Sequence, residues 1–534
     1  MDSVGQLRRK LTWGFDGKSI MTDKGYDSRG RLESEWQPRF DTAAAEFART
    51  FEYDDLNRIV NTNSYDDISP TTGYSTRTDY TGFTQTHTNP KSQKRTDLRD
   101  VLGRVQRTTD AANKNTDFSY DVFGNLTQTI DPNTNVIKVE YDKLGRKTRL
   151  TDPNLGRIDY FIDARSLLWR QQSPKQRAAA QFTTTQYDLL GRMISRLEPD
   201  LESRWEFDSA ATGKGQLAET YTLTGPANNK TKDYRRLHAY DNLGRPSTIS
   251  QTLGEAIGTT VYTHQSEYDD WGRVITETYQ RGSDPAKVFQ ARYNAYGYLA
   301  QWQRPASITP TAIPAIVLWR IAQQSAAQQP IVSRFGNNLT EIRDYDTRAN
   351  RLRGMVIRNV VLTNRVTDNY TFDAIGNVNN RNVTWETGGF SELFAYDELN
   401  RLKTSQVSGK ASQSFAYDAV GNMTQKTGVG AGTVNTVIYP AQGPAAIRTN
   451  ALVRVTGAAG TFGAGIYTYD DNGNLATAPN SGTASWTSFD MPLTLAKVNS
   501  GITSTASFTY GPEHHHARQI TRTRLAEALR DIGT

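Results

Sequence analysis

The sequence predicts an all-β protein built of successive antiparallel hairpins. Three observations lead to this prediction: a short motif recurs along the chain, many copies lie about 21 residues apart, and the residues ahead of each copy alternate in polarity. Helical periodicity is confined to Thr42–Ala48 and Thr521–Arg530, which we expect to be the only helical stretches.

The motif reads aromatic-Asp-x-x-Gly/Asn-Arg/Asn-aliphatic, as in YDVFGNL from Tyr120 and YDKLGRK from Tyr141, which lie 21 residues apart. Clear copies begin at Tyr26, Tyr53, Tyr120, Tyr141, Tyr187, Tyr240, Tyr268, Tyr293, Tyr345, Phe372, Tyr396, Tyr417 and Tyr469. Worn copies begin at Arg99, Ile162 and Phe207. A fixed period of this length indicates one supersecondary unit that stacks on its neighbours.

Each copy has the chemistry of a strand, a turn and a returning strand. Residues such as Thr116–Tyr120 alternate with the period of two that a half-buried strand shows. The Asp after the aromatic residue can accept backbone N–H bonds, and the Gly or Asn three residues later tolerates positive φ. A single hairpin is marginal in water, so neighbouring copies must pair edge to edge.

Composition excludes several classes of protein. The 534 residues contain no Cys, which rules out disulfides and thiol chemistry. Only 36% of the residues are hydrophobic, but 26 Tyr argue against disorder, so the chain folds without being a solid globule.

Charge and hydropathy argue against nucleic acid and membrane partners. The net charge is +6 without a Lys/Arg block, which does not favour nucleic-acid binding. The longest apolar run, Ala315–Trp319, is too short to span a membrane. The N-terminus has no apolar signal-peptide region, so we expect synthesis in the cytoplasm and, if the protein is exported, a non-classical route; its final location stays unknown.

The repeated YDxxGRL and YDxxGNL units resemble the RHS/YD-repeat family over residues 1–520, and residues 521–534 form a short divergent tail that we expect to be helical. The resemblance implies that the hairpin strip spirals into a hollow shell, or cocoon. In bacterial polymorphic toxins and in the C component of insecticidal toxin complexes, such a shell encloses a C-terminal toxic domain. Residues Phe207–Leu217 are similar to an elongated turn of the toxin-complex branch.

The resemblance implies a non-enzymatic carrier that encapsulates and delivers a C-terminal effector. We expect that this sequence contains the carrier part and not the effector. The family's autoprotease motif Asp-Pro-x-Gly is not matched by Asp131-Pro132, Asp152-Pro153 or Asp284-Pro285, so we expect no self-cleavage. The sequence starts inside a repeat at Met1 and ends 24 residues after Tyr510. We therefore expect an incomplete shell that associates with a second RHS-containing component, like the toxin-complex B component, or with itself.

No catalytic, cofactor-binding or metal-binding residue is assigned from the sequence. Only His514 and His516 of the triplet His514–His516 have the spacing of a ligand pair on a strand, and we interpret the triplet as a solvated loop. Asp470–Asn474 only faintly resembles a calcium loop, because the closing Glu is missing. The remaining histidines are scattered singly: His87, His238 and His264.

Two other functions stay open. The chain could be a surface or secreted repeat protein that binds carbohydrate or protein partners, with the motif tyrosines stacking on sugars. We favour a structural role for these tyrosines, each packing across the strip toward the next repeat. An enzyme hidden in the repeats is the least favoured alternative.

Overall fold

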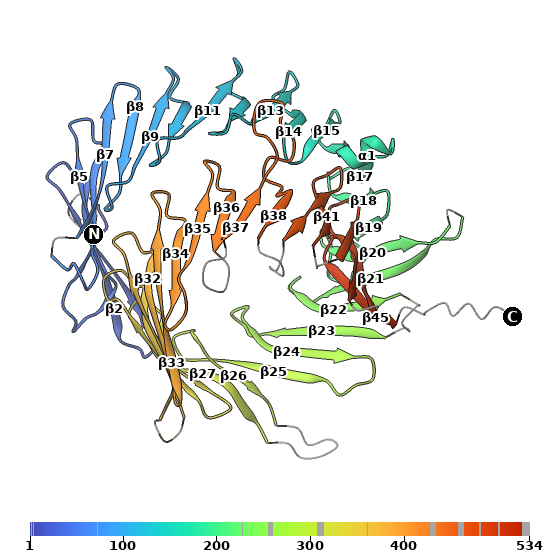
Figure 1. Cartoon of the computed structure of the whole chain (residues 1–534). Coiled ribbons are helices and arrows are strands. Elements are labelled where there is room, and N and C mark those ends of the chain that lie inside the picture. The colour runs from blue at the N-terminus through green and yellow to red at the C-terminus, as the bar shows by residue number, and fades with distance from the viewer. Residues whose placement is uncertain are drawn as a thin grey trace. The chain divides into compact units, whose positions relative to one another are not determined.

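The computed structural model is almost entirely antiparallel β-structure, as the sequence predicts (Figure 1). It describes residues 1, 3, 5–71, 73–226, 228–254, 260–306, 314–359, 361, 363–427, 434–457, 464–479, 482–499 and 502–525. Within these residues, one long sheet contains 39 strands and a second sheet contains six, β40 to β45.

The strands follow one another along the chain with short connections. Strands β1 to β15 are Arg9–Trp13, Ser19–Tyr26, Leu32–Trp36, Arg39–Phe40, Phe47–Tyr53, Ile59–Ser64, Tyr74–Thr81, Thr84–Thr88, Lys94–Arg99, Val105–Thr109, Asn115–Tyr120, Leu126–Ile130, Val136–Tyr141, Lys147–Asp152 and Gly156–Ile162. Strands β16 to β30 are Leu168–Gln172, Thr183–Tyr187, Met193–Leu197, Glu202–Phe207, Leu217–Thr224, Thr231–Tyr240, Pro246–Leu253, Val261–Tyr268, Val274–Arg281, Lys287–Tyr293, Leu299–Arg304, Ile316–Gln324, Pro330–Phe335, Thr340–Tyr345 and Leu352–Arg358. Strands β31 to β45 are Asn364–Phe372, Val378–Trp385, Gly388–Tyr396, Leu402–Val407, Gln413–Tyr417, Met423–Thr427, Val434–Ile438, Arg454–Thr456, Gly465–Ile466, Thr468–Tyr469, Leu475–Ala478, Gly482–Trp486, Pro492–Asn499, Ile502–Tyr510 and His516–Leu525.

The chain divides into two compact units, each of which combines early and late repeats. Unit 1 consists of Met1–Asn115, Val274–Thr276 and Val288–Phe415. Unit 2 consists of Thr116–Arg273, Glu277–Lys287 and Ala416–Thr534. Each strand pairs mostly with the next one in the chain, and the register shifts by a β-bulge at the motif tyrosine, as between Glu140 and Tyr141.

The turn after Tyr141 shows why the motif has its composition. Asp142 Oδ1 accepts the backbone N–H groups of Leu144 at 2.9 Å and Arg146 at 3.0 Å, and its Oδ2 accepts Arg146 Nε–H at 2.7 Å. The backbone bond from Arg146, together with its guanidinium, lowers the pKa of Asp142 despite the opposing cost of desolvation. Gly145 has φ +75°, as the motif predicts. Motif copies with Asn in place of Arg keep the same bond, because Asn125 Nδ2 donates to Asp121 Oδ2 at 2.8 Å.

The motif tyrosines join each repeat to the one before it. The Tyr187 hydroxyl donates to the Leu168 carbonyl at 2.8 Å, and the Tyr396 hydroxyl donates to the Val378 carbonyl at 2.7 Å. Arginines of the preceding turn cover some of the rings, as Arg245 does at 4.5 Å from the Tyr268 centroid. The tyrosines therefore have a structural role between neighbouring repeats, but they reach a carbonyl and a guanidinium of the preceding repeat where we expected packing on the tyrosine one repeat on.

The two segments that we expected to be helical are not helical in their described residues, 42–48 and 521–525. Thr42–Ala48 is a turn that leads into β5, because the chain pairs there with β3. Thr521–Leu525 belongs to β45 and pairs with β44, so the expected tail boundary at residue 521 falls inside a strand; residues 526–534 lie outside the described residues. The helix that does form, α1 (Pro174–Ala178), is only five residues long and is fixed by a capping box between Ser173 and Gln176.

The positive φ at the turn glycine gives a direct test of the motif. Gly145→Val should lower the free energy of unfolding by about 1–2 kcal/mol, because a β-branched residue is strained at positive φ. The nearest atom to an added Cβ is Asn125 Oδ1 at 3.5 Å, so the loss would come from the backbone and not from a clash. Lys143→Ala in the same turn should stay within about 0.5 kcal/mol. Equal losses for both variants in a denaturant melt would contradict the turn assignment.

Candidate functional site

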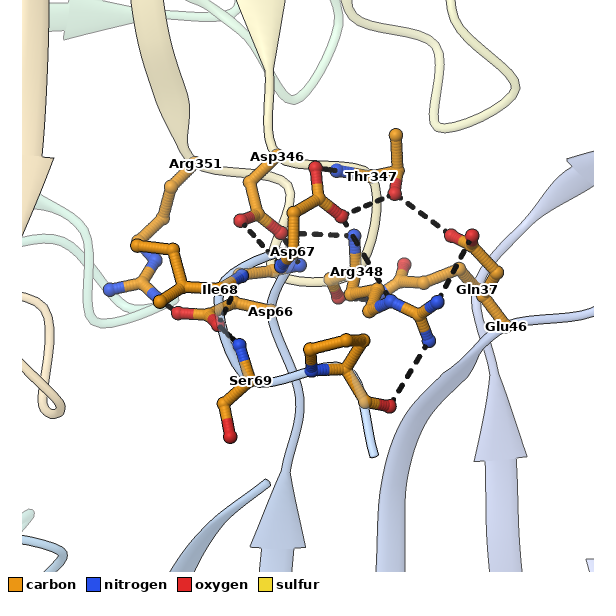
Figure 2. A network of polar contacts seen from close by, with 12 residues as sticks. Gln37, Glu46, Asp66, Asp67, Ile68, Ser69, Asp346, Thr347, Arg348 and Arg351 are labelled. Carbon is orange, nitrogen blue, oxygen red and sulfur yellow. Dashed lines mark hydrogen bonds and ion pairs between the residues drawn. The ribbon is translucent and has the colours of Figure 1, made fainter. Parts of the chain in front are cut away.

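Each unit contains a seam, defined as the line of contacts where turns of early repeats meet turns of late repeats. In unit 1 the loop between β6 and β7 meets the turn between β29 and β30 (Figure 2). The contacting residues lie about 280 positions apart in the sequence, as in the bond between Asp67 and Asp346.

Two turn aspartates, one from each side, form the centre of the unit 1 seam. Asp66 Oδ1 accepts the N–H groups of Ile68 and Ser69, and its Oδ2 pairs with Arg351 Nη2 at 2.9 Å. Asp346 Oδ1 accepts two N–H groups of its own turn, and its Oδ2 accepts the backbone N–H of Asp67 at 3.0 Å. Each aspartate thus holds its own turn and contacts the opposite one.

Peripheral contacts surround this pair of aspartates (Figure 2). Asp67 accepts the Thr347 hydroxyl at 2.6 Å and pairs with Arg353 Nη1 at 2.6 Å. Glu46 pairs with Arg348 at 3.3 Å, and its Oε2 lies 2.8 Å from the Thr347 hydroxyl oxygen. Carboxylates of the early side therefore face arginines of the late side.

The motif copy at Tyr345 departs from the standard spacing in a way that serves this seam. YDTRANRL has one extra residue between the Asp and the Arg, and Arg351 reaches across to Asp66. Asp66 is only 3% exposed, and a buried carboxylate is costly without a cation. Arg351, from a late repeat, supplies that cation.

Three motif copies with Asn in place of Arg also lie on the seams. In unit 1, Asp373 Oδ2 accepts from Asn377 and also pairs with Lys91 Nζ at 2.9 Å. In unit 2 the equivalent contacts are Asn133 Nδ2 to Asp418 Oδ2 at 3.1 Å and Lys175 Nζ to Asp470 Oδ2 at 3.8 Å. Because Asn is neutral, it does not balance the negative charge of the turn aspartate. In these three copies a donor from the opposite strip contacts the same aspartate oxygen.

His514 and His515 belong to the unit 2 seam, which corrects their interpretation as part of a solvated loop, whereas His516 is exposed at the start of β45. His514 Nε2 lies 2.9 Å from Glu198 and its ring stacks on Phe489. His515 Nε2 lies 2.8 Å from the Tyr234 hydroxyl. The side chains of His514 and His515 have different partners, and among the described residues no group of three His, Cys, Asp or Glu could hold a metal ion.

The other sequence candidates have ordinary structural surroundings. Asp470 accepts the N–H groups of Asn472 and Asn474, two and four residues later, as Asp142 does in its own copy. His264 stacks on Tyr279 at 4.5 Å, and His238 is a half-buried strand residue whose pKa is lowered by burial and by Arg236. In the described part of the chain, no helix is long and apolar enough to cross a membrane.

A polar cavity of about 680 Å³ borders the unit 1 network. Its lining combines the rings of Trp36, Tyr65 and Tyr74 with the guanidinium groups of Arg49 and Arg351. Rings beside charged groups suit a polar ligand with a flat face, so this cavity is a better place for such a ligand than the motif tyrosines, whose hydroxyl groups bond to backbone carbonyls.

The repeat is matched by a known family model. The model of the RHS repeat matches residues 99–136 and 124–156. Residues 99–156 of this chain therefore match RHS repeats.

Solved structures extend the likeness in fold to nearly the whole chain. The crystal structure of TcdB2-TccC3 superposes with a TM-score of 0.76 at 16% identity, covering 98% of this chain and 30% of that one. TcdB2-TccC3-TEV gives 0.76 at 16% identity with 94% and 28% coverage, and the Tc holotoxin pore of Photorhabdus luminescens gives 0.74 at 16% with 96% and 28%. The chain spans less than a third of those chains, and at this identity the likeness shows the fold. Comparison with curated proteins finds no match.

The ion pair between the buried Asp66 and Arg351 should contribute more to the free energy of unfolding than an exposed ion pair does. Arg351→Met should lower the free energy of unfolding by about 3–5 kcal/mol, because Asp66 would remain buried without its cation. The matched control is Arg365→Met, which breaks an exposed pair with Glu386 in the same unit and should cost no more than about 1 kcal/mol. Similar losses for the two variants in a urea melt would show that the seam is not a stabilising contact.

Proposed function

We propose that this chain is a wall segment of an RHS carrier shell, which encloses an effector without catalysing a reaction. The observation that carries the proposal is the pair of seams, at which early and late turns bond edge to edge within each unit. These bonds join repeats that lie far apart in the sequence into one wall within each unit. The likeness to TcdB2-TccC3 supports the same role, since the shared fold covers nearly all of this chain.

The buried charges favour a structural role over a catalytic one. Burial alone would raise the pKa of Asp159, but hydrogen bonds from Arg149, Arg157 and Arg177 outweigh it and lower the pKa to about 2. Glu219 is held by Lys232 and Arg235 in the same manner, with burial again opposed by its two cations. Such carboxylates stay ionised at neutral pH and cannot take up a proton as a general base with a pKa near 7 would.

A second RHS wall is the partner that the exposed turns favour. In unit 2, the second residue after the motif Asp forms what we call the apolar turn row: Phe123, Leu144, Leu190, Leu243 and Trp271, which are 75–85% exposed. The equivalent Val420 is part-buried, in the turn whose Asp418 is contacted by Asn133 of an early turn. Turns of the same kind are therefore covered by the opposite edge of another strip inside this chain. We propose that the apolar turn row is covered likewise by the turn edge of a separate RHS component.

The wall proposal predicts a hollow or open particle. A solid globule of 534 residues has a radius of gyration of about 24 Å. Small-angle X-ray scattering of the purified chain should give a clearly larger value, with a distance distribution that lacks the central maximum of a solid sphere. A radius of about 24 Å with a compact distribution would contradict the shell.

The partner proposal predicts association through the apolar turn row. Multi-angle light scattering at micromolar concentration should give a mass above 59.7 kDa for the wild-type chain. Replacing Phe123, Leu144 and Leu190 by Asn should return the mass to that of a monomer, with little loss of stability because the three side chains are exposed. The control is Ile466→Asn with Val498→Asn, two exposed apolar residues outside the row. A wild-type monomer would favour the alternative, a self-sufficient repeat protein that binds carbohydrate or protein, with the polar cavity of unit 1 as its site.

A further inference from the structure

The unit 2 seam contains a cluster of basic groups that the proposed function does not use. The turn between β44 and β45, residues 511–515, contacts β21 through His515. Tyr234, Arg236 and His238 lie on one face of β21, because alternate residues of a strand share a face. Tyr234 is 3% exposed, and its ring meets the His515 ring edge to face at 5.1 Å.

The contacts around His515 indicate which ring nitrogen carries the proton when the imidazole is neutral. Arg236 Nη2 lies 3.4 Å from His515 Nε2, and a guanidinium can only donate, so Nε2 is an acceptor. The same nitrogen lies 2.8 Å from the Tyr234 hydroxyl. A neutral ring that accepts at Nε2 carries its proton on Nδ1, which faces Glu513 at 3.3 Å.

A proton added to Nε2 would meet an existing cation. Arg236 lies in β21, and among the described residues no carboxylate forms an ion pair with it; its Nε is buried without a hydrogen-bond partner. His238, on the same face, has a buried Nε2 that also lacks a partner. Protonation of both histidines would place three positive charges together, with Glu513 as the opposing negative charge.

The remaining charged groups near this contact are few. Asp233 and Arg518 line a small cavity beside Tyr234, and no carboxylate or cation comes from the β22 residues that line it. The neighbouring His514 Nε2 lies between the Glu198 carboxylate at 2.9 Å and the guanidinium of Arg196. Arg196 is itself paired with Glu198 at 3.1 Å, whereas Arg236, which faces His515, forms no ion pair with a carboxylate among the described residues.

We propose that the contact between residues 511–515 and β21 is an acid-sensitive latch, which opens when His515 and His238 take up protons beside Arg236. Burial, followed by the charge of Arg236, lowers the pKa of both imidazoles from the ordinary value of 6.5. Above pH 6.5 both are neutral whether the latch is closed or open, so the closed state has its full stability. Below pH 6.5 the open state binds protons first, and the closed state loses stability as the pH falls.

Hydrogen exchange of the whole chain, followed by mass spectrometry, tests the latch. Between pH 7.5 and 5.5, after correction for intrinsic exchange, peptides from 502–525 and from β21 should lose protection by about tenfold or more, since one unit of pKa difference is a factor of ten. Peptides from β13 and β14 should keep their protection and serve as the internal reference.

Three variants distinguish a latch from general acid destabilisation. His515→Gln with His238→Gln should remove the change with pH, because Gln cannot take up the proton. His87→Asn, in β8 of unit 1, should leave the ratio between the two pH values unchanged. Glu513→Gln should enlarge the ratio, because the carboxylate that favours protonated His515 is gone. An unchanged ratio in the double variant, or a wild-type chain without any local change, would overturn the proposal.

Discussion

The bond between the motif aspartate and its own turn is the constraint on which the rest of this structure depends. One oxygen of Asp142 accepts the N–H groups two and four residues later, and the other accepts a side-chain N–H of Arg146. This leaves the residue between them, Gly145, in the left-handed region. The same geometry recurs in the worn copy at Arg99, where Asp100 bonds to Leu102 and Arg104 although the aromatic residue is lost. The turn therefore needs the Asp more than it needs the tyrosine.

Stability in such a strip comes from ladders and turns more than from an apolar core. Among the described residues, the buried side chains are mostly polar, and several, such as Thr220 and Ser203, are almost completely buried. Few apolar residues are buried, in keeping with a hydrophobic content of 36%. Contacts between repeats take over the role of a core: the motif tyrosine bonds to a carbonyl of the preceding repeat, and the arginine of that repeat covers some of the rings.

The sequence predicted this local structure well because the turn and the strand are encoded over a few residues. It predicted the positive φ of Gly145 and the strand alternation, but it assigned no bonding role to Arg146. It failed at Thr42–Ala48, where the Ala-rich residues form a turn and Phe47 already pairs with Trp36 of β3. It could not find the seams, because residues such as Asp66 and Arg351 are 285 positions apart and share no period. A signal was present nonetheless: the extra residue in the copy at Tyr345, and the Asn in the copies at Phe372, Tyr417 and Tyr469.

The residue after the turn, Arg or Asn, decides whether the motif aspartate has a counter-charge within its own repeat. In an Arg copy such as Asp142 with Arg146, the turn carries its own counter-charge, and the remaining guanidinium nitrogen is free to bond to the next turn, as Arg146 Nη1 does to the Asp163 carbonyl at 2.9 Å. In an Asn copy such as Asp373 with Asn377, the turn contains no positive charge to balance the aspartate. Lys91 supplies this counter-charge from the opposite strip. Because an unpaired buried carboxylate is costly, the Asn in the copy at Phe372 favours the joined state of the two strips. The Arg copy at Tyr345 also bonds across, through Arg351, so the sequence of each turn and its position in the strip together set where two strips bond.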